Sequence, residues 1–325
     1  MSETTYREAI NRGLGDAMAA DERVLLLGED IAAAGGPFKV TNGLLERFGP
    51  ERVLDTPISE QAIVGAAIGA AIRGLRPMAE LMFADFAGVC FDGIANELAK
   101  YRYMTGGQVE VPVVIRLANG AGGGFAAQHS QTCENWFLNV PGLKIVAPAT
   151  PADAYGLLRS AFDDPDPVLY FEHKHLYNHK GALAKAPAAV PIGRADVVAA
   201  GTDVTIVANQ MMRLRAEEAL GELERAGVSA ELIDPRTIAP LDLETVGESV
   251  AKTNRLLVVQ ESPADGSWGA SLISRLVQDH FELLDAPPRL LACEDTPAPY
   301  AANLEAAWMP GVADIVAAAT DVVAF

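Results

Sequence analysis

The sequence has few basic residues and no long apolar run. Its 325 residues include 25 Lys and Arg against 43 Asp and Glu, which gives a formal net charge of −18 at pH 7. Because phosphate backbones and anionic lipid surfaces repel such a protein, we expect neither a nucleic acid nor a membrane as its partner. No apolar run reaches the roughly 18 residues that a transmembrane helix needs, so we expect no segment that spans a bilayer.

Cysteine is also scarce. The three cysteines, Cys90, Cys133 and Cys293, lie far apart and form no C-x-x-C pair. An odd and sparse set of cysteines is typical of reduced thiols and excludes a disulfide framework. The first residues, MSETTYREAINRGL, show no basic region followed by an apolar stretch, as a secretory signal would. Both observations predict a cytoplasmic location.

Half of the residues are hydrophobic and 21% are charged, which is typical of a globular protein with a sizeable core. Short β-rich segments alternate with helix-period segments along most of the chain. A strand over 111–117, for example, follows a helix predicted over 85–103. This alternation predicts an α/β fold with parallel sheets. The pattern lapses after Tyr177, so we interpret 1–180 as one domain, 181–200 as a linker and 201–325 as a second, smaller domain.

No G-x-x-x-x-G-K-[ST] motif occurs, which excludes a P-loop. The glycine run NGAGGGF (119–125) follows a predicted strand, as a phosphate-binding loop would. Read from its first glycine, it has Phe125 where a dinucleotide fingerprint needs Gly. Read from Gly122, a weaker form fits through Gly124 and Ala127, but no acidic residue stands about 20 residues further on. We therefore do not predict an NAD oxidoreductase, and we interpret the run as a loop at the ligand-binding edge of a sheet.

Two further motifs are ambiguous by themselves. HKHLYNH places His173, His175 and His179 within seven residues, but no Cys ligand or second cluster completes a zinc site. We interpret it as the exposed polar end of a strand. In DTPISE (55–60), a turn leads into a helix with Ser59 at the N-cap and Glu60 in the first turn. On these six residues alone, Glu60 is interpreted as an acid that complements the helix dipole.

Eight segments in order resemble one family, the β subunits of the thiamine-diphosphate-dependent first component of 2-oxo acid dehydrogenase complexes. They are LLGED (26–30), RVLDTPISE (52–60), GLRPMAELMFADF (74–86), AKYRYM (99–104), AAQHSQ (126–131), PGLKIVAP (141–148), DPRTIAPLD (234–242) and PAPYAANLE (297–305). They cover nearly the whole chain. The resemblance implies a transketolase-like pyrimidine-binding domain that binds thiamine diphosphate, followed by a transketolase C-terminal-like domain.

The resemblance also implies roles for individual residues. Glu60 matches the carboxylate that bonds to the distal pyrimidine nitrogen of the coenzyme and promotes its imino form. Phe86 matches the aromatic residue that packs against the aminopyrimidine, and Ile58 is among the neighbouring contacts. His129 matches a histidine that faces the substrate and the incoming lipoyl group. Glu60 and His129 are therefore the predicted catalytic residues.

One family motif is missing from the chain. Relatives hold Mg²⁺ and the diphosphate with a Gly–Asp–Gly motif, and the nearest match here is Ala264–Asp265–Gly266. The resemblance implies that an α subunit carries this half of the site in an α2β2 heterotetramer. It also implies a K⁺ site made of backbone carbonyl oxygens. Its donors would be Val113, Ala161, Phe162, Asp164 and Asp166.

The second domain shows no cluster of titratable residues beside a glycine loop, so we expect it to serve assembly. The family uses this region to dock the dihydrolipoyl acyltransferase, whose lipoyl domain accepts the acyl group. The substrate is a small molecule whose identity stays open. Segments 80–92 and 171–177 look most like acetoin dehydrogenase β subunits, and the pyruvate and branched-chain enzymes are close behind. An alternative of another class is a non-catalytic α/β binding module, which loss of Glu60 or Phe86 would favour.

Overall fold

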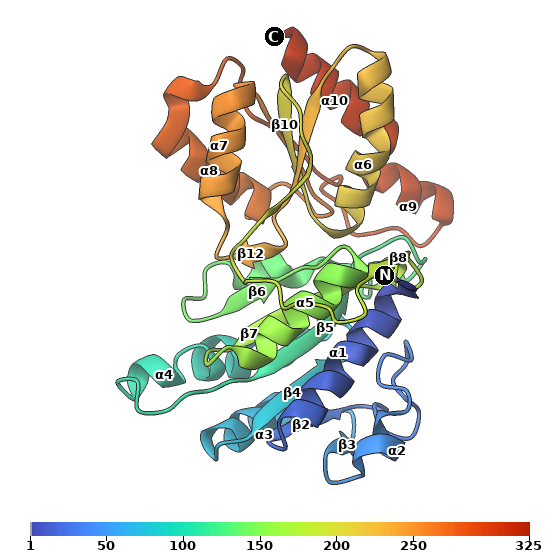
Figure 1. The fold of residues 1–325 in the computed structure, drawn as a ribbon, viewed down its shortest axis with the longest axis vertical. Coiled ribbons are helices and arrows are strands. Elements are labelled where there is room, and N and C mark those ends of the chain that lie inside the picture. The colour runs from blue at the N-terminus through green and yellow to red at the C-terminus, as the bar shows by residue number, and fades with distance from the viewer. Residues whose placement is uncertain (1) are drawn as a thin grey trace. The chain divides into compact units, whose positions relative to one another are not determined.

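The computed structural model describes residues 2–325, and the chain divides into two compact units. Unit 1 consists of the residues up to Asn119 together with Trp136–Ile192. Unit 2 consists of Gly120–Asn135 together with Gly193–Phe325. Each unit is a β-sheet with helices packed on it (Figure 1), which confirms the predicted α/β class.

Six parallel strands form the sheet of unit 1. In order across the sheet they are β6 (Lys144–Val146), β7 (Val168–His173), β5 (Val114–Asn119), β4 (Arg76–Leu81), β2 (Val24–Gly28) and β3 (Val53–Asp55). Parallel sheets are covered on both faces, and accordingly β5 and β7 are buried at every residue. The carboxyl ends of these strands meet at one edge, where open α/β sheets bind ligands.

Two helices, α1 (Tyr6–Ala20) and α5 (Pro151–Asp163), lie side by side on one face of this sheet (Figure 1). α1 begins with a capping box, in which the Glu8 carboxylate accepts from the Thr5 N–H at 2.8 Å. α5 begins at Thr150, whose hydroxyl accepts from the Asp153 N–H at 3.1 Å. α3 (Glu60–Ile72) packs against β4. The smaller elements are β1 (Ser2–Thr5), which pairs antiparallel with β8 (Lys180–Leu183), α2 (Leu44–Phe48), η3 (Cys133–Phe137) and η4 (Lys174–Leu176).

The single helix predicted over 85–103 is wrong. The segment forms a 3-10 turn, η1 (Ala84–Gly88), a π-helical turn, η2 (Gly93–Leu98), and the short helix α4 (Tyr101–Met104). Two glycines in the segment weaken a regular helix. Gly93 also brings η2 close to α3, because a Cβ added there would lie 3.3 Å from the Cγ1 atom of Val64.

Unit 2 is built on a five-stranded sheet. Its order is β14 (Arg289–Leu291), β13 (Leu256–Val259), β10 (Val204–Ala208), β11 (Ala230–Asp234) and β9 (Asp196–Ala199). The first four strands are parallel, whereas β9 is antiparallel to β11. β9 and part of β8 lie within the segment 181–200 that was interpreted as a linker. Each has four residues and at most one of them is buried, so neither produces a clear hydrophobic pattern.

Helices cover both faces of the second sheet. Figure 1 shows α6 (Gln210–Arg225) and α10 (Val312–Ala324) on one side and α7 (Leu243–Thr253) and α8 (Trp268–His280) on the other. The remaining elements are β12 (Thr237–Ala239), η5 (Phe281–Leu283) and α9 (Ala302–Trp308).

One stretch, Ala302–Ala324, is long and apolar enough to cross a membrane by length and composition alone. In the structure it is interrupted at Pro310 between α9 and α10. Ile315, Ala318 and Ala319 of α10 are buried in the core cluster of unit 2. A helix with one face in the core explains this composition without a bilayer.

The cysteines confirm one prediction, and a histidine contradicts another. Cys90, Cys133 and Cys293 are buried and form no disulfide within the described residues, as expected of reduced thiols. His173, however, is the last residue of β7 and is fully buried, so the interpretation of its segment as an exposed strand end is wrong at this position. Within residues 2–325 no group of His, Cys, Asp and Glu is arranged to hold a metal ion.

A buried charge cluster lies in the middle of the unit 1 sheet. The Arg116 guanidinium on β5 forms ion pairs with Glu80 on β4 and with Glu172 on β7, where its Nη2 lies 2.6 Å from Oε2. The Tyr177 hydroxyl donates to Glu172 at 2.8 Å. Burial alone would lower the pKa of Arg116, but the charges of Glu172 and Glu80 raise it above its usual value. Burial raises the pKa of Glu80 and Arg116 offsets only part of that rise.

Substituting Arg116→Met should strongly destabilise unit 1, because it leaves two buried carboxylates without a counterion. We expect a loss of about 3–5 kcal/mol in the free energy of unfolding, measured as a lower urea midpoint. Arg194→Met is the matched control, since Arg194 and Glu244 form an exposed ion pair at 3.4 Å whose loss costs less than about 1 kcal/mol. Equal midpoints for the two variants would contradict the structural role of Arg116.

Candidate functional site

Glu60 is the first residue of α3 and lies at the carboxyl edge of the unit 1 sheet. Although it begins a helix, its side chain is buried, with 8% exposed. Among the described residues no group donates a hydrogen bond to its carboxylate, and no cationic side chain pairs with it. A buried carboxylate without such partners is unfavourable by itself. It is therefore suited to a ligand that brings a donor, such as a protonated ring nitrogen.

A thiol and a second acidic side chain lie near Glu60. Burial, and then the charge of Glu60, raise the pKa of the Cys90 thiol to about 12. Burial, followed by Asp30 and Glu60, also raises the pKa of the Glu29 carboxyl. These shifts place Cys90 and Glu29 within electrostatic reach of Glu60. Negative charge accumulates here, which favours a ligand that carries a proton.

Phe86 belongs to the same neighbourhood. It lies in η1, and its ring meets the ring of Phe83 edge-on at 5.6 Å between centroids. Its carbonyl oxygen is 3.8 Å from the sulfur of Cys90, the thiol on which Glu60 acts. Ile58, in the turn before α3, is 75% exposed. Such exposure suits a side chain that a ligand or a partner chain covers.

Thr56 was not predicted as a site residue. Its hydroxyl oxygen is buried and has no hydrogen-bond partner among the described residues. It follows β3 directly, two residues before Ile58, so it lies on the same edge of the sheet. A buried hydroxyl without a partner is uncommon in folded proteins. Nothing in the sequence distinguished Thr56, because a Thr in a turn is unremarkable until its burial is known.

His129 lies in unit 2, in the segment 120–135, whereas Glu60, Phe86 and Ile58 lie in unit 1. It is half-buried, and its N–H donates to the carbonyl of Ala126 at 3.4 Å. Ala126 has a φ of 60°, which is uncommon for a residue with a side chain. The hydroxyl of Ser130, the residue after His129, is buried without a partner among the described residues. The positive φ of Ala126 and the hydrogen bond from the His129 N–H thus define a turn in the backbone at 126–129.

The glycine run before His129 binds carboxylates of its own chain. The N–H of Ala121 donates to Glu261 at 2.6 Å, and the N–H groups of Gly122 and Gly124 donate to Glu305. The expectation that the second domain has no titratable residues beside a glycine loop is therefore wrong. The contacts join residues 140 and 183 positions apart, which no local motif can indicate.

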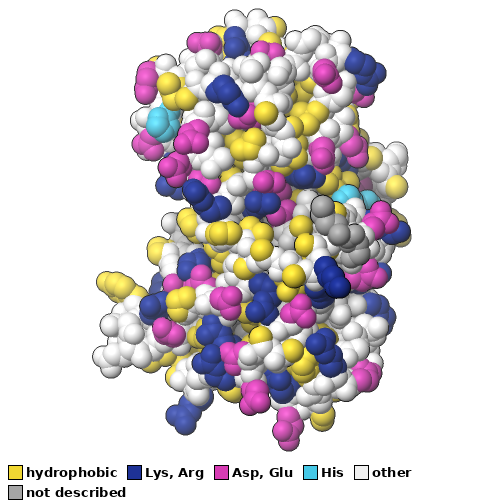
Figure 2. Space-filling view, in the orientation of Figure 1, with side chains coloured by type: hydrophobic (Ala, Val, Ile, Leu, Met, Phe, Trp, Pro, Cys, Tyr) yellow, Lys and Arg dark blue, Asp and Glu magenta, His cyan; other side chains and the backbone are white. Residues whose placement is uncertain are grey.

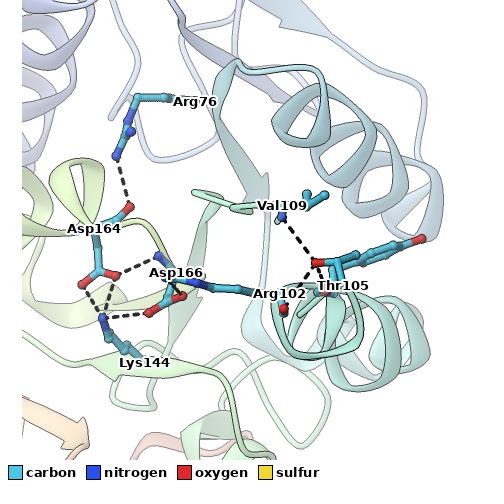
Figure 3. Close-up of polar contacts among 8 residues, drawn as sticks. Arg76, Arg102, Thr105, Val109, Lys144, Asp164 and Asp166 are labelled. Carbon is cyan, nitrogen blue, oxygen red and sulfur yellow. Dashed lines mark hydrogen bonds and ion pairs between the residues drawn. The ribbon is translucent and has the colours of Figure 1, made fainter. Parts of the chain in front are cut away.

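The predicted K⁺ ligands surround the end of α5, and a network of charges fixes this region (Figure 3). The Arg76 guanidinium donates to the carbonyl of Phe162 at 2.9 Å and to that of Asp164 at 3.1 Å. The Lys144 ammonium binds the Asp164 carboxylate at 2.6 Å.

Arg102 reaches the Asp166 carboxylate at 2.6 Å, and the Val113 carbonyl accepts from the Val168 N–H at 3.0 Å. Carbonyl oxygens of this kind bind K⁺ in proteins. The Phe162 carbonyl already accepts from two nitrogens of Arg76, Nε and Nη2, so the ion would have to share this oxygen with the guanidinium. The K⁺ site stays a prediction.

The magnesium half of the coenzyme site does not fit this chain. Asp265 of the nearest motif lies in unit 2, before α8. Within residues 2–325 no set of acidic or imidazole ligands is grouped for a metal ion. The residues present therefore fit the pyrimidine half of the coenzyme, through Glu60 and Phe86, and not its metal-bound diphosphate.

Family models match both parts of the chain. Residues 2–180 match the transketolase pyrimidine binding domain, and residues 193–315 match the transketolase C-terminal domain. Among solved structures, the inactive β4 tetramer of a split-gene transketolase is similar, with a TM-score of 0.81, 24% identity and 98% of each chain covered. This similarity concerns the fold alone.

Curated relatives are similar over almost the full length. The chain is 46% identical to the pyruvate dehydrogenase E1 component subunit beta-2 of Oryza sativa, covering 98% of this chain and 85% of that protein. It is also 46% identical to the acetoin:2,6-dichlorophenolindophenol oxidoreductase subunit beta of Cupriavidus necator, covering 96% and 95%. The corresponding pyruvate dehydrogenase subunit of Rickettsia conorii is 43% identical, with 97% of each covered. The chain therefore belongs to the family of E1 β subunits of thiamine-diphosphate-dependent 2-oxo acid and acetoin dehydrogenases, with transketolase-like domains.

Proposed function

We propose that this chain is the β subunit of a two-chain enzyme that cleaves a C–C bond next to a carbonyl and passes the acyl group to a lipoyl acceptor. The observation that carries the proposal is the buried Glu60 carboxylate, which accepts no hydrogen bond from the described residues. The relatives of this family support the reaction class.

Thiamine diphosphate, when bound, supplies a thiazolium carbon that acts as the nucleophile toward the substrate carbonyl. Glu60 would bind the distal pyrimidine nitrogen and hold or release the proton there, which is the work of a general acid–base group. Phe86 would pack against the pyrimidine ring, and the exposed side chain of Ile58 would contact the same ring. His129 would hold or donate a proton where the acyl group is passed on, since imidazole changes charge near neutral pH.

A partner α subunit completes this proposal. No described residues form a magnesium site, so the Mg²⁺ that accompanies the diphosphate would be held by the partner.

Large apolar side chains are exposed on unit 1, among them Val89 at 61%, Tyr103 at 89% and Met104 at 59%. Figure 2 shows hydrophobic atoms at the left edge of the molecule, where α4 lies in Figure 1. Exposed apolar residues of this size are typical of interfaces. We propose an α2β2 assembly, because shared sites favour closed two-fold symmetry, and docking to a dihydrolipoyl acyltransferase.

The substrate is proposed only as a class. Relatives named for pyruvate and for acetoin are equally similar to this chain, so both compounds and the branched-chain 2-oxo acids remain candidates. A substrate panel with the assembled α–β enzyme and 2,6-dichlorophenolindophenol as acceptor would identify it.

The purified chain alone should bind thiamine diphosphate weakly and show no turnover, because its residues 2–325 form no site for Mg²⁺. Adding the α subunit should produce activity with one member of the substrate panel. Isothermal titration of the coenzyme and dye reduction measure the two effects. Turnover by the β chain without a partner would contradict this division of the site.

Substituting Glu60→Gln should slow proton–deuterium exchange at the thiazolium carbon of the bound coenzyme by about 10²–10⁴-fold. The amide keeps the size of the side chain but cannot carry the proton. Coenzyme affinity should fall only modestly, because the diphosphate is held by the partner chain. Exchange is followed by NMR after acid quench in the assembled enzyme.

Two variants control this experiment. Glu51→Gln, at an exposed glutamate of the same unit, should exchange at the wild-type rate. His129→Ala should also exchange normally but transfer the acyl group to lipoamide slowly. A folded Glu60→Gln enzyme with wild-type exchange would show that Glu60 serves only the helix dipole, where it contributes at most about 1 kcal/mol.

We also propose that K⁺ binds the carbonyl oxygens around the end of α5. Replacing K⁺ by choline at equal ionic strength should then lower the midpoint of thermal unfolding, because a ligand that binds only the folded state stabilises it. Differential scanning fluorimetry measures the midpoint. Equal midpoints in the two salts, or an equal rise with Na⁺ and K⁺, would contradict a specific K⁺ site.

A further inference from the structure

The glycine run of unit 2 is held by two buried carboxylates that no step above uses. We propose that Glu305 and Glu261 are positioning residues, which fix the loop 119–131 in the conformation that His129 needs for acyl transfer. This inference rests on the proposed function, because it assigns the carboxylates a role through His129. It concerns contacts within unit 2 alone.

Three backbone N–H groups of the loop donate to the two carboxylates. Ala121 donates to Oε1 of Glu261 at 2.6 Å. Gly122 donates to Oε1 of Glu305 at 2.9 Å, and Gly124 donates to Oε2 of the same group at 3.1 Å. Gly122 and Gly124 have φ values of 91° and 68°, which side chains rarely tolerate. This backbone turns the N–H groups of Gly122 and Gly124 toward one anion, which resembles the nests that bind phosphate.

The anion that these N–H groups bind is the Glu305 carboxylate, a side chain of the protein itself. Glu305 is 4% exposed and Glu261 is 6% exposed, so both carboxylates have lost most of their water. Among the described residues, no cationic side chain pairs with Glu305, and the loop supplies its hydrogen-bond donors. Since a buried carboxylate requires donors, the charge and the loop conformation depend on each other. A free phosphate would have to displace Glu305, which explains why a glycine run at a sheet edge need not be a phosphate site.

The elements that carry the two carboxylates are also anchored within unit 2. Glu305 lies in α9, and Trp308 of the same helix donates from its ring nitrogen to the carbonyls of Glu294 at 3.0 Å and Thr296 at 2.9 Å. Trp308 also packs in a buried cluster with Ala121 of the loop. Glu261 follows β13 of the unit 2 sheet.

The far side of the loop is anchored to the same region. The Thr132 hydroxyl donates to the carbonyl of Glu261, and the Asn135 amide donates to the Ser262 hydroxyl at 3.0 Å. Asn135 in turn accepts from the N–H of Trp268, at the start of α8, at 2.9 Å. His129 therefore lies between two anchored segments. Residues 121–124 bind Glu261 after β13 and Glu305 of α9, and residues 132–135 bind the segment after β13 and the start of α8.

The test compares Glu305→Ala, Glu305→Gln and the control Glu248→Gln in the assembled α–β enzyme. Glu248 is an exposed glutamate on α7 of the same unit. Three quantities are measured: amide hydrogen exchange of peptides that cover 119–131, acyl transfer to lipoamide, and proton exchange at the thiazolium carbon. Glutamine keeps an oxygen acceptor, so it separates the hydrogen bonds from the bulk of the side chain.

Glu305→Ala should raise amide exchange in 119–131 by about 10- to 100-fold, because hydrogen bonds to a charged acceptor are lost. Acyl transfer should fall by about tenfold or more, as expected when a reacting group is misplaced. Thiazolium exchange should remain at the wild-type rate, since Glu60 lies in unit 1. Glu305→Gln should restore much of both losses, and Glu248→Gln should match the wild type.

Unchanged amide exchange in Glu305→Ala would overturn the inference, and so would faster exchange with normal acyl transfer per folded enzyme. Should Glu305→Ala fail to fold, Glu305→Gln with wild-type exchange and transfer would overturn it equally, and intermediate values of both would support it. A wild-type enzyme that never acylates lipoamide would contradict the proposed function instead. The amide exchange would then still decide whether Glu305 holds the loop.

Discussion

A carboxylate removed from water needs a hydrogen-bond donor or a counterion, and this requirement organises both units of the chain. In unit 1, Glu172 and Glu80 are satisfied by Arg116 in the middle of the sheet. In unit 2, Glu305 is satisfied by backbone N–H groups. Glu60 differs, because it is buried and the described residues offer it no donor. Glu60 is therefore the position where we propose that a ligand supplies the donor.

The same requirement distinguishes Glu60 from the ion-paired carboxylates of the Arg116 cluster. The carboxyl edge of a parallel sheet is the one place where a buried side chain can still be reached from outside. Glu60 lies there, at the start of α3, whereas Arg116, Glu80 and Glu172 lie on strands and form ion pairs with one another. Glu60 and Glu80 are each 8% exposed, so the two carboxylates differ in their partners and not in their depth.

The sequence predicted what short-range chemistry controls. The start of α3 at Glu60 was predicted correctly, although the Ser59 side chain makes no capping hydrogen bond. The strand β5 was recognised by its apolar run, with both ends displaced by two or three residues. The region 85–103 was wrongly predicted as one helix, since Gly93 is there to allow close approach to α3, a tertiary requirement. The pairing of Glu305 with the glycine run spans 183 residues and has no local signature. Thr56 and His173 were missed for a related reason, because burial is a property of the fold and not of the segment.

Unit 2 is made of two separate stretches of the chain, Gly120–Asn135 and Gly193–Phe325. The residues between them belong to unit 1. A single cut near residue 192 would therefore not divide the protein into its two structural parts. A fragment that ends there would retain the glycine run but lack Glu261 and Glu305, leaving three backbone N–H groups without their acceptors. Chimeras between relatives face the same difficulty, and they should exchange 120–135 together with the C-terminal half so that the loop and its carboxylates are inherited from one parent.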